Sequence, residues 1–264
     1  MEAAFFDLDK TVIARASMVA FGKPLYRAGL VSRWLVLRAL WAQLVYLQFG
    51  HDDAQMERSR AAVLRLTKGR DQAKVTAVVR DALEEVIEPI VYEEALALLR
   101  HHRAEGRRVF LVSASPIEVV APLAQYLQVD DAIATRARVD ERGRYTGELE
   151  FSSHGANKVV AMEHLARRHD LDLARCWAYS DSVTDLPMLE AVGHPVAVNP
   201  DRTLRRLAEE RGWEVRDFTL AVPLRGRTPG AAQAAVAGAA VAGAAALTWW
   251  ALHRWRGDTS SAPR

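Results

Sequence analysis

The sequence predicts an α/β fold in which parallel strands alternate with helices around one central sheet. Short apolar segments recur along the chain with helical stretches between them, and each segment is followed by polar or turn residues. A length of 264 residues allows one sizeable α/β domain with an insertion, or two small domains. The polar centre and the glycines of Val139–Gly147 are typical of a hairpin turn. The predicted strands are Ala3–Leu8, Arg107–Val112, Asp131–Thr135, Arg175–Tyr179, Pro195–Val198 and Trp213–Arg216.

A helical segment separates the first predicted strand from the second. Residues 16–88 contain no convincing strand, so we expect a helical-bundle cap inserted into a core formed by 1–15 and 89–222. Within this cap, Leu30–Phe49 is notably apolar, but two arginines interrupt it and would be costly in the middle of a bilayer. We therefore interpret this stretch as a core helix of the bundle rather than as a membrane span.

The C-terminal part of the chain is apolar and free of charge. Residues 228–252 contain no Asp, Glu, Lys or Arg, and Ala231–Leu252 would measure about 33 Å as a helix, against a hydrocarbon core of roughly 30 Å. Trp249 and Trp250 suit a membrane interface, and a basic, flexible tail follows at 253–264. We expect a hydrophobic helix that spans or associates with the membrane, although an alanine-rich linker or soluble helix is the alternative.

Composition excludes several classes of protein. Half of the residues are hydrophobic and 26% are charged, which excludes a disordered, collagen-like or disulfide-stapled chain. The formal net charge of +2 is too balanced for a general nucleic-acid binder, so we expect no nucleic-acid partner. Cys176 is the single cysteine, so the chain can form no internal disulfide and no cysteine metal cluster. A reducing compartment is the simplest location, and with no export signal at the N-terminus we expect a cytoplasmic domain anchored by the C-terminal helix.

Pairs of carboxylates follow the first and the fourth predicted strands. Asp7 and Asp9 stand at the carboxyl end of the first strand, where open α/β sheets bind ligands. Taken alone, this pair is a weak signal, and a solvated strand end that carries two acids by chance is the alternative. Asp181 and Asp185 repeat the arrangement after the fourth strand. Like charges this close need a neutralising cation, and an oxygen-rich set of ligands suits Mg²⁺.

A serine and a lysine add the means to bind an anion. Ser115 and Glu118 have the spacing of a capping box, with a proline at the first helical position, so a helix is predicted to begin there. Ser113 lies just before that helix and offers a hydroxyl and backbone N–H groups to an anion. Lys158 lies in the first turn of another predicted helix, where it opposes the helix dipole. A phosphate partner would explain this position, and an ordinary surface lysine is the alternative.

The ordered set of these residues resembles the four motifs of the haloacid dehalogenase-like (HAD) hydrolases. The set reads Asp7-x-Asp9-x-Thr11-Val12, Ser113, Lys158 and Asp181-x3-Asp185. The segments Phe-Asp-Leu-Asp-Lys-Thr and Tyr-Ser-Asp-Ser-x-x-Asp-Leu-Pro-Met-Leu are similar to the branch that contains phosphoserine phosphatase, the HAD-IB type. The resemblance covers residues 3 to about 218 and implies a Rossmann-like core, with a cap inserted where that branch places one.

The resemblance also implies a phosphomonoester hydrolase that works through an aspartyl-phosphate intermediate. Asp7 would be the nucleophile, and Asp9 would be the general acid for the leaving alkoxide and then the base that activates water. Mg²⁺ would be held by the Asp7 carboxylate, the Asp9 backbone carbonyl and Asp181, with Asp185 supporting these ligands. The transferring phosphoryl group would be bound by Thr11, Ser113, Ala114 and Lys158.

Several substrates remain compatible with the sequence. Phosphoserine phosphatases carry an acidic residue shortly after the first motif that helps to bind the substrate ammonium, whereas Ile13–Ala20 contains no acid. Arg58 or Arg60 could bind a substrate carboxylate, but a solvated helix face explains them equally well. The apolar cap helix and the predicted membrane helix favour a lysophospholipid or another amphipathic phosphate ester. Histidinol phosphate and other small phosphorylated metabolites are further candidates.

Two interpretations of other classes stay open. A phosphotransferase or phosphomutase of the HAD type would use the same aspartyl-phosphate but pass it to an alcohol instead of water. A non-catalytic, membrane-tethered interaction protein could keep the fold alone. Such a protein would be expected to have lost parts of the motifs, and here all four acids, Ser113 and Lys158 are present.

Overall fold

The computed structural model describes residues 1–31, 64 and 67–219. All of them belong to one compact unit, Met1–Pro223. Several predicted features lie outside the described residues. They are the membrane helix at 228–252, the tail at 253–264, most of the apolar cap helix Leu30–Phe49, and Arg58 and Arg60, the candidates for binding a substrate carboxylate. Within the described ranges, no helix is long and apolar enough to cross a membrane.

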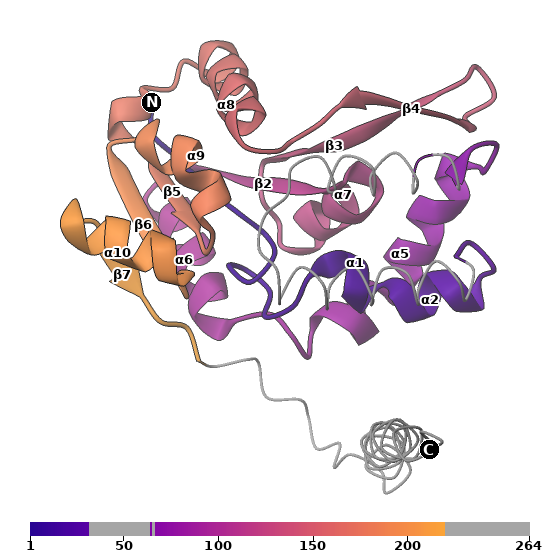
Figure 1. Cartoon of the computed structure of the whole chain (residues 1–264), viewed down its shortest axis with the longest axis horizontal. Helices are drawn as coiled ribbons and strands as arrows, with labels where there is room; N and C mark the ends of the chain where they lie inside the picture. Colours follow the sequence, from indigo (N-terminus) through magenta and orange to yellow (C-terminus); the bar gives the residue numbers. More distant parts are fainter. Residues whose placement is uncertain (32–63, 65–66, 220–264) are drawn as a thin grey trace, which may run out of the picture. The chain divides into compact units, whose positions relative to one another are not determined.

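The described part is built on a mixed, mostly parallel sheet with the strand order β4-β3-β2-β1-β5-β6-β7 (Figure 1). Among the strands of the described residues, only the pair β3–β4 is antiparallel. Each of the six strands predicted from the sequence is confirmed. The strands are β1 Ala3–Phe6, β2 Arg108–Pro116, β3 Asp131–Val139, β4 Tyr145–Phe151, β5 Trp177–Ser180, β6 His194–Val198 and β7 Glu214–Arg216.

The central strand β1 divides the hydrophobic core into two halves. Its side chains alternate between the faces of the sheet, and all four are buried. Ala4 and Phe6 belong to one apolar cluster, which includes residues of α5 (Gln72–Ile87), α6 (Glu93–Ala104) and α7 (Ile117–Tyr126). Ala3 and Phe5 belong to the other, which includes residues of α8 (Ala156–His169), α9 (Leu186–Glu190) and α10 (Arg202–Glu210). Burial on both faces explains why a four-residue apolar strand suffices at the centre of the sheet.

Short helical elements complete the chain between these strands. The predicted cap region opens with α1 (Ser17–Ala20) and α2 (Gly22–Arg27), and the described part of it ends with α5. Single 3-10 turns occur at Leu173–Arg175 and Val183–Asp185. The bounds proposed for the cap, 16–88, stay a prediction.

The hairpin β3–β4 is longer than the sequence pattern indicated. We predicted the first part of β3, Asp131–Thr135, and the turn, but neither the rest of β3 nor β4, because these exposed segments carry charged side chains in place of the apolar run expected of a strand. Arg136 pairs with Glu150 and Arg138 with Glu148 across the two strands. The tip of the hairpin bonds to the chain that leads into α5, where Gly69 N donates to the Tyr145 carbonyl at 2.8 Å and Gln72 N donates to the Gly143 carbonyl at 3.0 Å.

The predicted capping box at Ser115 and Glu118 is wrong. Strand β2 runs through Pro116, and α7 begins at Ile117 without a side-chain cap. Both polar side chains have partners elsewhere: the Ser115 hydroxyl bonds to Asp9 and Ser17, and Glu118 Oε1 accepts from Gln72 Nε2 at 2.7 Å. Tertiary hydrogen bonds therefore replace the local ones that the spacing suggested.

Candidate active site

The carboxyl ends of β1, β2 and β5 bring the predicted residues to one edge of the sheet. Asp7 directly follows β1, and its N–H donates to the Tyr179 carbonyl of β5 at 2.9 Å. Asp181 directly follows β5, and Ser113 lies in β2, the other neighbour of β1. These three residues are between 1% and 8% exposed. Polar residues buried at this depth, at the end of a parallel sheet, mark the place where such folds bind ligands.

Lys158 lies between two carboxylates in the interior. Its Nζ is 2.7 Å from Asp7 Oδ1 and 2.7 Å from Asp185 Oδ2, and the residue is 2% exposed. The alternative of an ordinary surface lysine is therefore wrong. Burial by itself would lower the pKa of Lys158, but Asp7 and Asp185 outweigh burial and raise the pKa, so the ammonium stays charged.

Asp185 binds Lys158 directly through a hydrogen-bonded ion pair. Its Oδ2 accepts hydrogen bonds from Lys158 Nζ at 2.7 Å and from Ser180 Oγ at 2.8 Å. Ser180 is fully buried at the end of β5, and no role for it was expected from the sequence. Its position immediately before Asp181 was the only available signal. Asp185 and Ser180 thus hold the lysine that contacts Asp7.

Asp9 is held through both oxygens of its carboxylate. Oδ1 accepts from the backbone N–H of Ser17 at 2.8 Å, and Oδ2 accepts from the Ser115 hydroxyl at 3.1 Å. The Oγ atoms of Ser17 and Ser115 are 2.8 Å apart. Burial raises the pKa of Asp9, and the hydrogen bonds from Ser17 and Ser115 offset part of that rise. Neither partner was expected from the sequence, because both come from other elements of the fold.

The three remaining candidates for phosphate binding have different surroundings. The Thr11 hydroxyl is buried and has no hydrogen-bond partner within the described part of the chain. Ser113 Oγ accepts from the N–H of Ser115 at 3.1 Å, and the Ala114 carbonyl accepts from Thr135 Oγ1 at 2.7 Å. The pairing of β2 with β3 shifts register between Val112 and Pro116, so the ladder is irregular at this serine segment.

The charge balance of the site fits a divalent cation. The four carboxylates of Asp7, Asp9, Asp181 and Asp185 face two lysines, buried Lys158 and exposed Lys10, whose Nζ is 4.0 Å from Asp181 Oδ2. Burial raises the pKa of Asp181 to about 7, with Lys10 opposing and Asp185 adding to the rise. Burial also raises the pKa of Asp7 well above its ordinary range, although Lys158 opposes it. A bound cation would relieve this cost of ionisation.

Side chains alone do not form a complete metal site. In the described ranges, no group of three or more His, Cys, Asp or Glu side chains has an arrangement that could hold an ion. A magnesium ion here would therefore need backbone carbonyl oxygens and water besides the carboxylates, which is usual for this ion. The donor set that the resemblance implies, two carboxylates and one backbone carbonyl, agrees with this condition.

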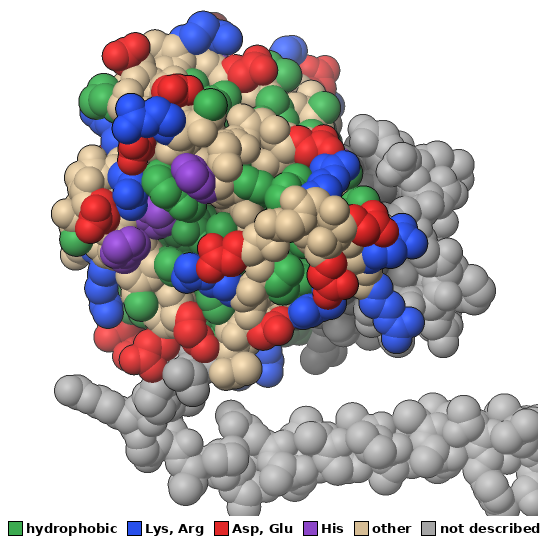
Figure 2. All heavy atoms as spheres, turned by 90° about the vertical axis from the view of Figure 1, so that its left-hand side faces the viewer, with side chains coloured by type: hydrophobic (Ala, Val, Ile, Leu, Met, Phe, Trp, Pro, Cys, Tyr) green, Lys and Arg blue, Asp and Glu red, His purple; other side chains and the backbone are tan. Residues whose placement is uncertain are grey.

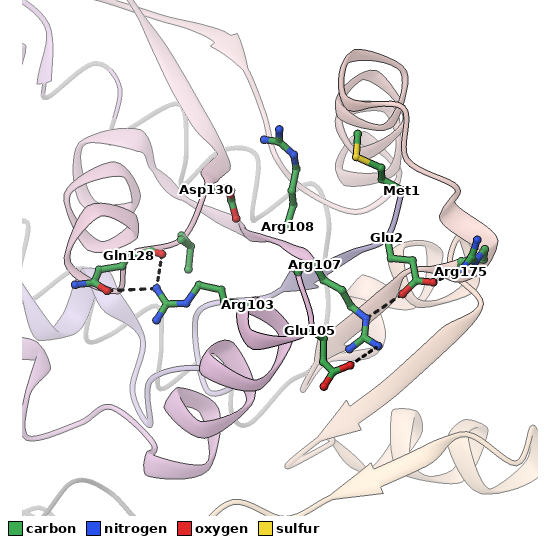
Figure 3. Close-up of a pocket in the computed structure, with 11 residues that line it drawn as sticks. Met1, Glu2, Arg103, Glu105, Arg107, Arg108, Gln128, Asp130 and Arg175 are labelled. Carbon is green, nitrogen blue, oxygen red and sulfur yellow. Dashed lines mark hydrogen bonds and ion pairs between the residues drawn. The ribbon is translucent and has the colours of Figure 1, made fainter.

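A separate cavity of about 810 Å³ lies at the opposite edge of the sheet (Figure 3). Its lining includes Glu2 before β1, Arg107 before β2 and Asp130 before β3, so it is at the amino ends of the strands. Glu2 binds Arg107 and Arg175. On the face shown in Figure 2, acidic and basic side chains are interspersed. None of the predicted catalytic residues lines this cavity.

Comparison with known proteins identifies the family. A sequence profile of the haloacid dehalogenase-like hydrolases matches residues 4–190. The chain belongs to this family. The match contains all four motifs described above, from Asp7 to Asp185, so the predicted resemblance is confirmed. The branch is the one that resembles phosphoserine phosphatase, and the protein is an HAD-type phosphatase.

Individual relatives agree with this assignment. The chain is 48% identical to the "Inhibition of morphological differentiation protein" of Streptomyces azureus, over 96% of this chain and 94% of the relative. It is 38% identical to the phosphoserine phosphatase SerB1 of Mycobacterium tuberculosis, over 89% and 77% of the two chains. A solved structure of a protein of unknown function from Bordetella pertussis has 31% identity and a TM-score of 0.70, covering 82% and 98%. A phosphoserine phosphatase structure with 18% identity and a TM-score of 0.56, covering 81% and 92%, shares the fold.

Proposed function

We propose that this phosphatase is a Mg²⁺-dependent phosphomonoester hydrolase that forms an aspartyl-phosphate on Asp7. The observation that carries the proposal is the buried Asp7–Lys158–Asp185 network at the carboxyl edge of the sheet. A buried lysine bonded to the nucleophile reduces the repulsion that an incoming phosphate dianion would meet. Membership of the HAD family supports the same chemistry.

The reaction divides into two displacements at phosphorus. In the first, a carboxylate oxygen of Asp7 forms a bond to phosphorus, the bond from phosphorus to the leaving oxygen breaks, and Asp9 gives its proton to that oxygen. In the second, water attacks the phosphoryl group, Asp9 takes the proton of the water, and the bond from Asp7 to phosphorus breaks to release inorganic phosphate. The raised pKa of buried Asp9 supports its role as an acid in the first step.

The other residues position and neutralise the phosphoryl group. Lys158 and Ser113 would bind its oxygens, together with Thr11, whose hydroxyl is unpartnered in the described structure, and the backbone at Ala114. Asp7, the Asp9 carbonyl and Asp181 would hold Mg²⁺, with Asp185 supporting them through its contact with Lys158. The ion supplies positive charge beside the phosphoryl oxygens.

We infer that the substrate is a small phosphorylated metabolite or a lysophospholipid with an apolar part. Ser17, which contacts Asp9, is followed in α1 by Met18 and Val19, and these two side chains are 41% and 54% exposed. They give the start of the predicted cap an exposed apolar surface, and Ile13–Ala20 carries no acidic residue for a substrate ammonium. This favours an amphipathic ester over phosphoserine. Membrane association through 228–252 would bring the enzyme to such a substrate.

The decisive experiment measures phosphate release by the full chain from a panel of esters, with Mg²⁺ or with EDTA. The panel contains phosphoserine, histidinol phosphate, lysophosphatidate and p-nitrophenyl phosphate. We expect Mg²⁺-dependent turnover that Asp7→Asn abolishes and that Asp130→Asn, a surface control at the far edge of the sheet, retains. Turnover that survives Asp7→Asn would refute the aspartyl-phosphate. Phosphoryl transfer to an added alcohol in place of phosphate release would identify a phosphotransferase.

A further inference from the structure

We propose that Ser115 is a positioning residue for the general acid and base Asp9, and that the Ser17 hydroxyl holds Ser115 in place. This inference rests on the proposed function, because it concerns the orientation of Asp9 during the reaction. It departs from the sequence pattern, in which Ser115 was expected to cap a helix. Neither serine belongs to the four motifs.

The contacts form a closed ring around the Asp9 carboxylate. Ser115 Oγ contacts Asp9 Oδ2 at 3.1 Å, Ser17 Oγ contacts Ser115 Oγ at 2.8 Å, and Ser17 N contacts Asp9 Oδ1 at 2.8 Å. Ser115 is 7% exposed and Ser17 is fully buried. Because each oxygen of the Asp9 carboxylate has its own partner, the carboxylate cannot rotate about its Cβ–Cγ bond without losing a hydrogen bond.

The directions of these hydrogen bonds follow from the available protons. Asp9 Oδ1 accepts from a backbone N–H, so the proton of the neutral acid belongs on Oδ2. When Asp9 is ionised, Ser115 donates its single proton to Oδ2, and Ser17 must then donate to Ser115. When Asp9 is protonated, and before it gives its proton to the leaving oxygen, Oδ2–H can donate to the Ser115 hydroxyl. The Ser115 hydroxyl can then donate to the Ser17 hydroxyl.

Two hydroxyls in series therefore suit both protonation states of Asp9. A hydroxyl is a donor and an acceptor at once, whereas an amide N–H or an ammonium facing Oδ2 could donate to the ionised form but could not accept the proton of the neutral acid. The proposed reaction needs both states in turn, because Asp9 is an acid in the first displacement and a base in the second. Ser17 is the first residue of α1, so the ring also ties the orientation of Asp9 to the predicted cap segment.

The test compares esters whose leaving groups differ in their need for a proton. An alkyl ester releases a strongly basic alkoxide, which needs the general acid, whereas p-nitrophenyl phosphate releases a weakly basic phenolate. We expect Ser115→Ala to lower kcat/KM at least about tenfold for alkyl esters and by less than about threefold for the nitrophenyl ester. The alkyl probes are butyl phosphate, phosphoserine and lysophosphatidate.

Three further variants make the result specific. Ser115→Thr keeps the hydroxyl and should restore the wild-type ratio of alkyl to aryl kcat/KM. Ser17→Ala keeps the N–H to Asp9 but removes the support for Ser115, so it should shift the ratio in the same direction by a smaller factor. Ser153→Ala is the matched control, because Ser153 is fully buried and its hydroxyl has no partner in the described structure. Its ratio should equal that of the wild type.

The outcomes separate this inference from the proposed function. Wild-type protein that hydrolyses none of the esters would refute the function itself. Wild-type turnover combined with an equal loss on alkyl and aryl esters in Ser115→Ala would refute the positioning role and leave the function intact. Thermal unfolding of each variant shows whether it is folded, and if Ser115→Ala does not fold, Ser17→Ala decides by the same ratio.

Discussion

Replacing Lys158 by Met should destabilise the protein far more than removal of an average side chain. Methionine retains most of the apolar stem but leaves Asp7 and Asp185 buried without the ammonium that lies 2.7 Å from each. Loss of one partner from a buried ion pair costs about 3–5 kcal/mol, because the remaining charge has been removed from water without compensation. For a domain of this size, that loss corresponds to a fall in Tm of roughly 6–20 °C.

The size of this effect should depend on pH. Burial raises the pKa of Asp7 above its unfolded value, and removing Lys158 takes away the group that opposes the rise. A carboxyl with a raised folded pKa binds more protons in the native state, so it destabilises the fold as the pH rises through that pKa. The difference in unfolding free energy between Lys158→Met and the wild type should therefore be larger at pH 7.5 than at pH 5.

The assay is urea unfolding followed by circular dichroism, in EDTA, at both pH values. Lys10→Met is the matched control, because Lys10 is exposed and its Nζ lies 4.0 Å from Asp181. An exposed pair of this kind contributes less than about 1 kcal/mol. A loss below about 1 kcal/mol for Lys158→Met, or an equal loss at pH 5 and pH 7.5, would refute the uncompensated-charge argument.

Three other perturbations have directions that follow from the structure. Asp181→Asn should stabilise the protein by roughly 2–4 kcal/mol at pH 8 without Mg²⁺, because burial raises the pKa of Asp181 to about 7 and its ionised form is costly; an equal gain at pH 4 in urea unfolding would contradict this. Burial lowers the pKa of His102 to about 4, and Arg107 adds to this shift. The unfolded state therefore binds more protons than the folded state below pH 6.5. His102 should cost roughly 2–3 kcal/mol of unfolding free energy at pH 4.5. Replacement by Gln should remove that pH dependence, and an unchanged slope would count against it. Gly193→Ala should cost more than about 2 kcal/mol, because a Cβ there would lie 1.7 Å from the Ala174 carbonyl oxygen. Gly22→Ala, whose Cβ would meet no atom of the described residues within 4 Å, should leave Tm unchanged or higher.

Local patterns in the sequence were sufficient for six of the seven described strands and for the carboxylate pairs that follow β1 and β5. Apolar runs bounded by polar residues predicted the six strands that pair in parallel. Burial explains the apolar composition of the central strand β1, all of whose side chains are buried. The strand β4 escaped this criterion because it lies at an edge, where charged side chains such as Glu148 and Glu150 face solvent. The acids after β1 and β5 were found because their spacing relative to strand ends is a local property.

The contacts that set the roles of these residues were decided by the tertiary structure. Lys158 bonds to a carboxylate 151 positions away, and Ser115 to residues 98 and 106 positions away. A hydrogen bond depends on the distance between two atoms, and that distance depends on which strand ends become neighbours in the sheet. By itself the sequence thus determined which chemical groups stand at the strand ends. Only the folded sheet decided that Lys158 pairs with Asp7 and that two serines hold Asp9, because these pairs meet only after β1, β2 and β5 have aligned.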